Sequence, residues 1–169
     1  MFFLVIYLFF TVFFNFWISA SVENGRYYIP FVQNYLNFPS TLRSVLLNTS
    51  AFIIRLFGYK TMVDEYTLGI VGGSSARMVY TCIGYGYVSF LLALVLPYKT
   101  KLRKKTFLIV VGLLLIFIVN VLRISGLVIM STEGKVSLFR YIDHHTVLDL
   151  ILYPLLILLF MVILKPFKK

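Results

Sequence analysis

Residues 106–130 read TFLIVVGLLLIFIVNVLRISGLVIM, and this stretch indicates the fold class of the chain. As a helix it is long enough to cross a hydrocarbon layer about 30 Å thick, and Arg123 is its only charged residue. An ionised side chain inside a membrane costs free energy, so an arginine there marks a candidate functional site and needs a partner. The stretch therefore predicts a membrane-spanning helix with one functional arginine.

The composition also indicates a membrane protein. The chain has 169 residues, of which 60% are hydrophobic and 13% charged, and its mean hydropathy is +0.93; a soluble domain carries about twice that share of charges. Three more apolar segments can span: about Phe2 to Ala20, Met78 to Pro97 and Thr146 to Leu164. We expect an all-α integral membrane protein with about four transmembrane helices, folded as one membrane domain over residues 1–169.

The first segment has a second interpretation, as a signal peptide. Its apolar stretch is long for such a peptide, no lysine or arginine precedes it, and Ile18-Ser19-Ala20 is a poor cleavage site. An uncleaved first span is therefore favoured.

The basic residues indicate the orientation. The net charge is +10, but the lysines and arginines gather beside apolar segments, at 99–105 and 165–169, without forming a broad basic face, so no nucleic acid is expected as a partner. Positively charged loops stay in the cytoplasm. A multi-pass protein of the cytoplasmic membrane with both termini inside is predicted, with residues 21–73 and 131–143 outside.

The outer segment, residues 21–73, is polar and rich in tyrosine. Between Ser40 and Gly58 the apolar residues are spaced as in an amphipathic helix at the membrane interface, with Ser40 as its N-cap and Gly58 as its end. Alternatively, Val45 to Phe57 forms part of a span, although polar residues interrupt it. Residues 62–73 are expected to form a short hairpin or an extended loop. The chain would then hold five to six helices in all.

Three features lie at matching depths on the outer side: the only cysteine, Cys82; the arginine Arg123; and the only histidines, His144 and His145. Cys82 is about one turn inside the second span, and the histidines are at the mouth of the fourth. Arg123 lies seven residues before the end of the third span, roughly 10 Å along a helix, and its side chain can extend toward the interface. The three features can therefore meet in the outer leaflet.

These residue types suit acyl transfer. A thiol attacks as the thiolate, which a nearby arginine or protonated histidine favours, and an imidazole can pass the thiol proton to a leaving amine. Arg123 can stabilise the developing oxyanion. Asn120, one helical turn before Arg123, can hold the guanidinium or the substrate. Asp149, four residues after His145, or alternatively Asp143, can orient the imidazole.

Each residue also has a purely structural interpretation. A lone cysteine in a membrane helix is usually buried packing, a histidine pair often sits at the interface, and Arg123 can pair with Asp143 or Glu133 as a clasp. The glycines Gly84, Gly86, Gly112 and Gly126 favour close helix packing over ligand contact. Two adjacent histidines without a spaced partner do not indicate a metal site, and no cofactor is expected.

The ordered set Cys82-x-Gly84, Asn120-x-x-Arg123-Ile124 and a histidine at the mouth of the last span resembles the exosortase/archaeosortase family of membrane cysteine transpeptidases. The resemblance covers residues 75–164, which would form the catalytic core. It fits a short member that lacks the long N-terminal region of many relatives.

The resemblance implies a sortase-like reaction on exported proteins with a C-terminal signal made of a short motif, an apolar helix and a basic tail. Cys82 would form a thioester at the outer membrane face, Arg123 would stabilise the oxyanion, and His145, favoured over His144, would act as acid and base. The tyrosine-rich outer segment would recognise the substrate. Membrane lipids are the other expected partners, and the sequence holds no indication of oligomeric state.

Two further functions stay open. In one, the chain is a non-enzymatic membrane subunit or carrier that uses Arg123 to bind an anionic lipid or partner. In the other, less favoured because no acidic metal-binding motif accompanies the histidines, it is a lipid-modifying transferase that uses His144 and His145. Substitution of Cys82 distinguishes these two functions from the transpeptidase, because only the cysteine enzyme needs the thiol.

Overall fold

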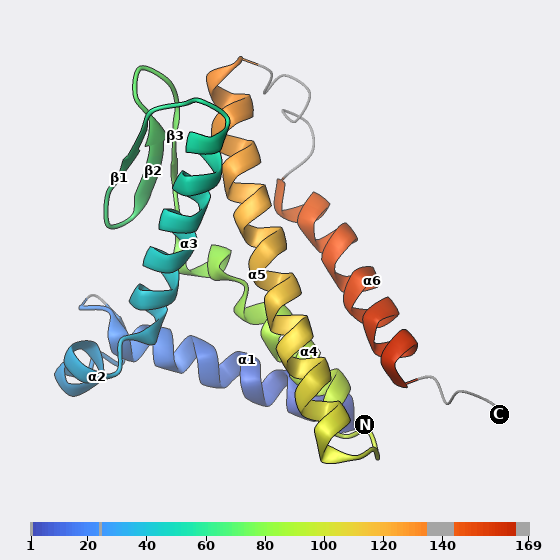
Figure 1. The fold of residues 1–169 in the computed structure, drawn as a ribbon. Coiled ribbons are helices and arrows are strands. Elements are labelled where there is room, and N and C mark those ends of the chain that lie inside the picture. Colours follow the sequence, from blue (N-terminus) through green and yellow to red (C-terminus); the bar gives the residue numbers. More distant parts are fainter. Residues whose placement is uncertain (1, 24, 135–143, 165–169) are drawn as a thin grey trace.

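The computed structural model describes residues 2–23, 25–134 and 144–164 (Figure 1). This part of the chain is mostly helical and contains one small sheet. Its elements are α1 (Phe2–Ser21), α2 (Pro30–Tyr35), α3 (Phe38–Leu56), β1 (Thr61–Val63), β2 (Thr67–Ile70), β3 (Ser75–Arg77), the 3₁₀ turn η1 (Tyr80–Ile83), α4 (Tyr85–Val95), α5 (Leu102–Thr132) and α6 (His144–Leu164).

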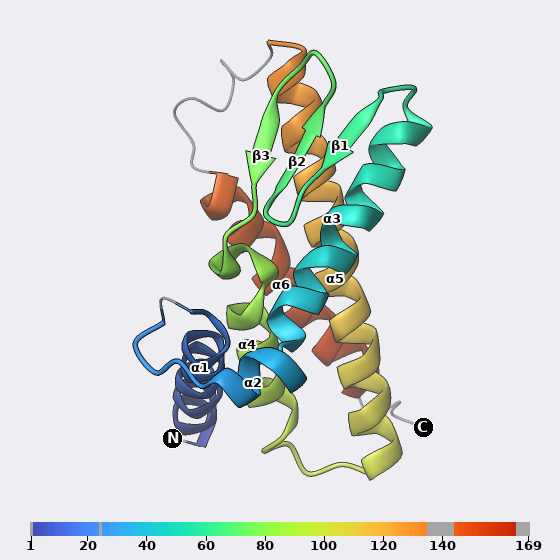
Figure 2. The same ribbon diagram turned by 90° about the vertical axis from the view of Figure 1, so that its left-hand side faces the viewer.

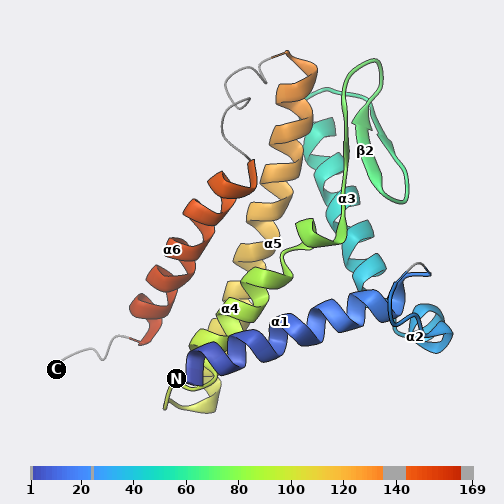
Figure 3. The same ribbon diagram turned by 180° about the vertical axis from the view of Figure 1, so that it is seen from behind.

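The helix α5 is the centre of the arrangement. It contains the whole predicted span 106–130 and extends beyond it at both ends. It contacts α3, α4, α6 and the strands β2 and β3, and Figures 1 and 2 show α3 and α6 running beside it. The first helix, α1, packs against α4 and crosses the lower part of the bundle at a steep angle to α5 (Figure 3).

The prediction of about four spans is only partly confirmed. Among the described residues, α1 and α5 are long and apolar enough to cross a membrane, and two shorter apolar helices occur at Tyr85–Val95 and Asp149–Ile163. The predicted second span, Met78 to Pro97, is the one that shortens most. Its first residues form a strand exit and a 3₁₀ turn, because Gly84 has a φ of +97° and interrupts the helix before Tyr85.

A helix forms where the amphipathic helix was predicted, but its N-cap differs from the predicted Ser40. The N-cap is Asn37, whose Oδ1 accepts a hydrogen bond from the backbone amide of Ser40 at 3.2 Å. The helix ends just before Gly58, as predicted, and Gly58 has a φ of +88°. The helix runs alongside α5 (Figures 1 and 2).

A buried polar contact at Ser50 joins α3 to α5. The Ser125 hydroxyl donates to the carbonyl oxygens of Val121 at 2.8 Å and Ser50 at 3.3 Å, and Ser50 and Ser125 are both buried. Of the polar residues between Val45 and Phe57, Ser50 is therefore part of the contact with α5, whereas Asn48 is exposed and, like Thr49, bonds to a carbonyl oxygen of its own helix.

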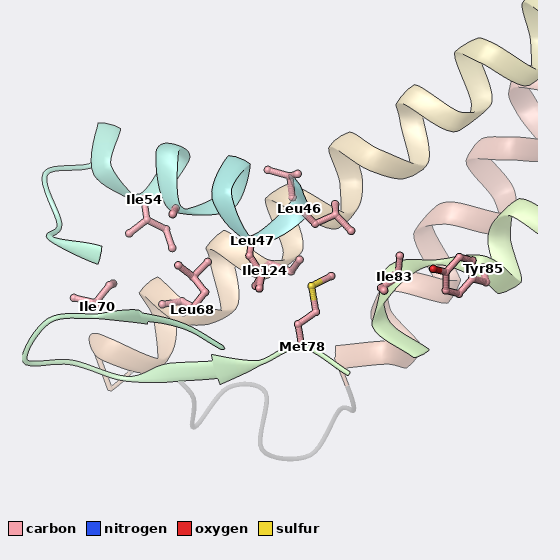
Figure 4. Packing of buried hydrophobic residues seen from close by; sticks show 12 residues of the cluster. Leu46, Leu47, Ile54, Leu68, Ile70, Met78, Ile83, Tyr85 and Ile124 are labelled. Atoms are coloured by element: carbon pink, nitrogen blue, oxygen red, sulfur yellow. The ribbon is translucent and has the colours of Figure 1, made fainter. Parts of the chain in front are cut away.

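A three-stranded antiparallel sheet, in the order β1-β2-β3, adds a β element to the predicted all-α fold. The pairing of Thr61 with Ile70 confirms the expected hairpin, and the pairing of Thr67 with Arg77 adds the third strand. Leu68 and Ile70 are buried, and through them the sheet packs against α3 and α5. Figure 4 shows these side chains facing Ile54 and Leu47 of α3.

A second apolar cluster joins α4, α5 and α6 around Leu91, Leu108 and Leu152. Here the expected close packing at a glycine is confirmed: a Cβ on Gly112 would lie 2.6 Å from a methyl carbon of Leu91. The absence of a side chain at Gly112 therefore sets how closely α4 approaches α5.

Gly112→Val should lower the free energy of unfolding in detergent by about 1–3 kcal/mol, because the new methyl groups overpack the contact with Leu91. Gly126→Val is the matched control, since Gly126 is on the same helix and a Cβ there meets no atom within 4 Å. Chemical denaturation followed by circular dichroism measures both variants. Equal losses in the two would contradict the packing role of Gly112.

Candidate functional site

Cys82 lies on the turn η1, between the sheet and α4, and not inside a spanning helix as predicted. The backbone amide of Met78 donates to the carbonyl of Tyr66 at 2.7 Å, which ends the sheet pairing. The amide of Cys82 then donates to the carbonyl of Val79 at 2.9 Å, which closes the turn. The Cys82 side chain is half-buried.

Cys82 and Arg123 line the same small pocket, with a volume of about 80 Å³. Arg123 comes from α5 and is also half-buried. The pocket is completed by Leu47, Ala76, Arg77, Met78, Ile124 and Leu127. The structure therefore brings together two of the three features that the sequence singled out, in a space large enough for a small polar group.

Arg77 is a second cation at this pocket, and sequence reasoning missed it. It is the last residue of β3, so the third strand, which was not predicted, is what carries it there. Two arginines therefore line the pocket together with one thiol, and the guanidinium carbon of exposed Arg77 lies 6.0 Å from the ring centre of Tyr66.

Asn120 holds the end of the cysteine turn. Its side chain is buried, and its Nδ2 donates to the carbonyl oxygen of Ile83 at 3.3 Å. Gly84 permits this approach, because a Cβ at that position would lie 2.7 Å from the same Nδ2 atom. The backbone at position 84 also has a positive φ, which glycine adopts more readily than other residues. The two sequence motifs Cys82-x-Gly84 and Asn120-x-x-Arg123 thus form one structural unit.

Arg43 of α3 holds the start of the turn. Its side chain is fully buried, and its Nη2 lies 3.2 Å from Oε1 of Glu65. The guanidinium carbon is 3.9 Å from the ring centre of Tyr66 and 4.8 Å from that of Tyr80, the first residue of η1. The turn is therefore fixed at both ends, by Arg43 through Tyr80 and by Asn120 through Ile83.

The neighbouring Glu65 raises the pKa of Tyr66. The Glu65 carboxylate raises the pKa of Tyr66 by accepting its hydrogen bond, burial raises it further, and Arg43 acts in the opposite direction. The protonated phenol therefore stays a hydrogen-bond donor to Glu65.

Arg43 is charged, yet the sequence holds a signal for its burial. It lies three, four and eleven residues before Leu46, Leu47 and Ile54, all of which are buried. Residues with that spacing share a helix face. The helical period therefore predicts that Arg43 is buried, whereas its charge taken alone indicates exposure.

The predicted residues of α6 are only partly described. His144 and His145 belong to its first turn, which lies near η1 in Figures 1–3, but their side chains lie outside the described part of the chain, as does Asp143. Asp149 accepts a hydrogen bond from the Tyr87 hydroxyl at 2.5 Å. This bond ties α6 to the start of α4.

The suggested clasp between Arg123 and Glu133 does not fit the helix. The two residues are ten positions apart on α5, roughly 15 Å along its axis. Glu133 instead accepts a hydrogen bond from the Tyr59 hydroxyl at 2.8 Å.

The fold and the pocket together define a helical membrane protein with a cysteine–arginine site. The model of the transmembrane exosortase family, Exosortase_EpsH, matches residues 1–162. The chain belongs to this family, which confirms the resemblance and extends it from residues 75–164 to nearly the whole sequence, α1 and the tyrosine-rich segment included. Neither the curated proteins nor the solved structures contained a match.

Arg43→Ala should loosen the cysteine turn, because two cation–π contacts, worth about 0.5–2 kcal/mol each, are lost. We expect Cys82, the only thiol, to react several-fold faster with a small maleimide. Arg55→Ala is the control, since exposed Arg55 bonds to Thr61 at 2.7 Å and not to the turn. An unchanged labelling rate in Arg43→Ala would show that Arg43 does not restrain the turn.

Proposed function

We propose that this exosortase-family protein is a membrane cysteine protease or transpeptidase that processes C-terminal sorting signals of exported proteins through a thioester on Cys82. The observation that carries the proposal is the shared pocket of Cys82 and Arg123, formed by segments far apart in a chain of this family. A cysteine present only for packing would not need an arginine at the same small pocket.

In the proposed reaction, the Cys82 sulfur attacks the carbonyl carbon of the scissile peptide bond. Arg123 donates hydrogen bonds to the carbonyl oxygen as it becomes negative. His145, or alternatively His144, takes the thiol proton and gives it to the leaving nitrogen when the carbon–nitrogen bond breaks. The C-terminal fragment leaves as an amine, and the rest of the substrate stays on Cys82 as a thioester.

A second nucleophile, an amine, a hydroxyl or water, then attacks the thioester carbon. The same imidazole accepts the proton of the nucleophile and returns it to the departing sulfur, so Cys82 is regenerated as a thiol. Arg77 also lines the pocket. Its positive charge adds to that of Arg123 near the oxyanion, which forms once in each of the two steps. Asn120 and Gly84 act in this scheme by positioning the turn.

Asp149 has two roles in the proposal. It shares a helix face with His145, four residues earlier, and can orient that imidazole. Its bond to Tyr87 holds the histidine end of α6 against the helix that follows the cysteine turn.

Cys82→Ala and Cys82→Ser should both abolish processing of a protein from the same genome that ends in a short motif, an apolar helix and a basic tail. Arg123→Lys should lower kcat about 100-fold, because lysine keeps the charge but loses the donor geometry. Release of the C-terminal fragment on gels is the measurement. A different result would favour a non-enzymatic carrier or subunit: Cys82→Ala processes the substrate normally, and Arg123→Ala loses lipid binding or assembly.

The proposed orientation places Cys82 on the outer side of the cytoplasmic membrane. A membrane-impermeant methanethiosulfonate should therefore modify Cys82 in intact cells. Thr100→Cys in a Cys82→Ala background is the matched control, because it puts the thiol in the basic loop that the positive-inside rule assigns to the cytoplasm. Modification of Thr100→Cys but not of Cys82 would show that the orientation is the reverse of the proposed one.

A further inference from the structure

The strand β3, Ser75–Arg77, has one paired edge and one open edge. It is the outer strand of the order β1-β2-β3, and among the described strands only β2 pairs with it. Figure 2 shows that β3 leads directly into η1, the turn that carries Cys82. Ala76 and Arg77 also line the pocket that holds Cys82. The strand with the open edge therefore adjoins the candidate nucleophile.

The hydrogen bonds to β2 show which backbone groups of β3 face this open edge. In an antiparallel pair, residues that bond to the partner strand alternate with residues whose N–H and C=O groups point away from it. Ser74 bonds across to β2 through its carbonyl at 3.0 Å, and Met78 bonds to the residue before β2 through its amide at 2.7 Å. Ser75 and Arg77 are the alternate residues. Their N–H and C=O groups therefore face the open edge.

These four groups are open to a partner. Ser75 and Arg77 are exposed, and their backbone groups form no hydrogen bond to other described residues. Two N–H donors and two C=O acceptors in line match the backbone of an extended peptide, which can add to a sheet edge as a further strand. A lipid acyl chain offers no such series of donors and acceptors. The open edge therefore suits a short extended segment of protein.

A second copy of the chain and the substrate are the two proteins that this edge can pair with. Pairing two copies through so short a strand would bring both Arg77 side chains close together, and like charges on neighbouring strands are destabilising. A substrate carries no such cost. It must also reach Cys82, and β3 lines the pocket of that thiol. The charge and the position of the edge therefore favour the substrate.

We propose that the open edge of β3 binds the extended segment of the substrate that carries the scissile bond, as a fourth strand of the sheet. This inference rests on the proposed function and adds the way in which the substrate is held. In the proposed orientation β3 runs from the outer side toward the membrane, and so does the substrate between its exported domain and its apolar helix. The added strand is therefore parallel to β3. In a parallel ladder, the substrate residue beside Ala76 donates its N–H to the Ser75 carbonyl and accepts from the Arg77 amide.

Proline at position 75 tests the edge from the enzyme side. Ser75→Pro removes an N–H group that faces the open edge and leaves the bonds to β2 in place. KM for the protein with the sorting signal should rise about three- to tenfold, the effect of one hydrogen bond, with little change in kcat, whereas Ser75→Ala keeps the N–H and the wild-type KM. Val63→Pro is the matched control, because the Val63 amide faces away from β2 at the opposite edge of the sheet. Equal KM values for Ser75→Pro and Val63→Pro would overturn the proposal.

Esters in the substrate test the hydrogen bonds with an unaltered enzyme, and they decide the proposal even if Ser75→Pro fails to fold. Synthetic substrates in which one backbone amide at a time, other than the scissile one, becomes an ester lose a single N–H and keep every side chain. KM should rise several-fold at every second position of the extended segment, because alternate N–H groups face β3. Equal sensitivity at consecutive positions, or no sensitivity at any, would contradict strand pairing.

Disulfide crosslinks give the direction of the added strand. In a Cys82→Ala background, Ser75→Cys should join a cysteine at one position of the substrate, and Arg77→Cys should join a position two residues nearer the substrate's C-terminus. A shift toward the N-terminus, or a disulfide only between two copies of the enzyme, would overturn the assignment. Because wild-type processing is measured in parallel, absent crosslinks with an active wild type reject the edge alone, whereas an inactive wild type rejects the proposed function.

Discussion

The backbone conformation of Gly84 is the constraint on which the candidate site depends. Its φ of +97° is one that side-chain-bearing residues rarely adopt, and α4 therefore begins after it and not at the start of the apolar segment. Cys82 is left on a separate turn at the end of the sheet. The missing Cβ also lets Asn120 approach and bond to the Ile83 carbonyl. One glycine thus decides both where the helix starts and how the cysteine turn is held.

Asn120 and Arg123 are about one turn apart on α5, so one rigid helix supplies a residue to an apolar groove, which forms where α3, η1, α4 and α5 meet, and a residue to the pocket. Asn120 lines the apolar groove, and Arg123 lines the pocket that holds the thiol. The groove and the pocket therefore keep a separation that is set by α5 and not by a flexible loop. Positioning of this kind is a large part of what a transfer enzyme supplies.

Local signals carried most of what could be predicted. The length of the apolar runs predicted α1 and α5, and rare reactive residues in apolar segments led to the shared pocket of Cys82 and Arg123. The start of α4 could not be predicted that way, because Met78 to Pro97 is mostly apolar and hydropathy does not report the sign of φ. The third strand was missed for a similar reason: it forms only through pairing with β2, and Arg77 reaches the pocket with it.

The two largest buried polar side chains lie at the ends of the cysteine turn. Arg43 and Asn120 are buried at the two ends of this turn, whereas the cluster of α4, α5 and α6 is held by side chains such as Leu91 and Leu152. A buried charge is no more stabilising than a well-packed apolar group of the same volume. Buried polar contacts instead restrict geometry: a guanidinium between two rings and an amide bonded to one carbonyl allow few alternative arrangements. Stability alone therefore does not explain Arg43, and restraint of the segment that presents Cys82 does.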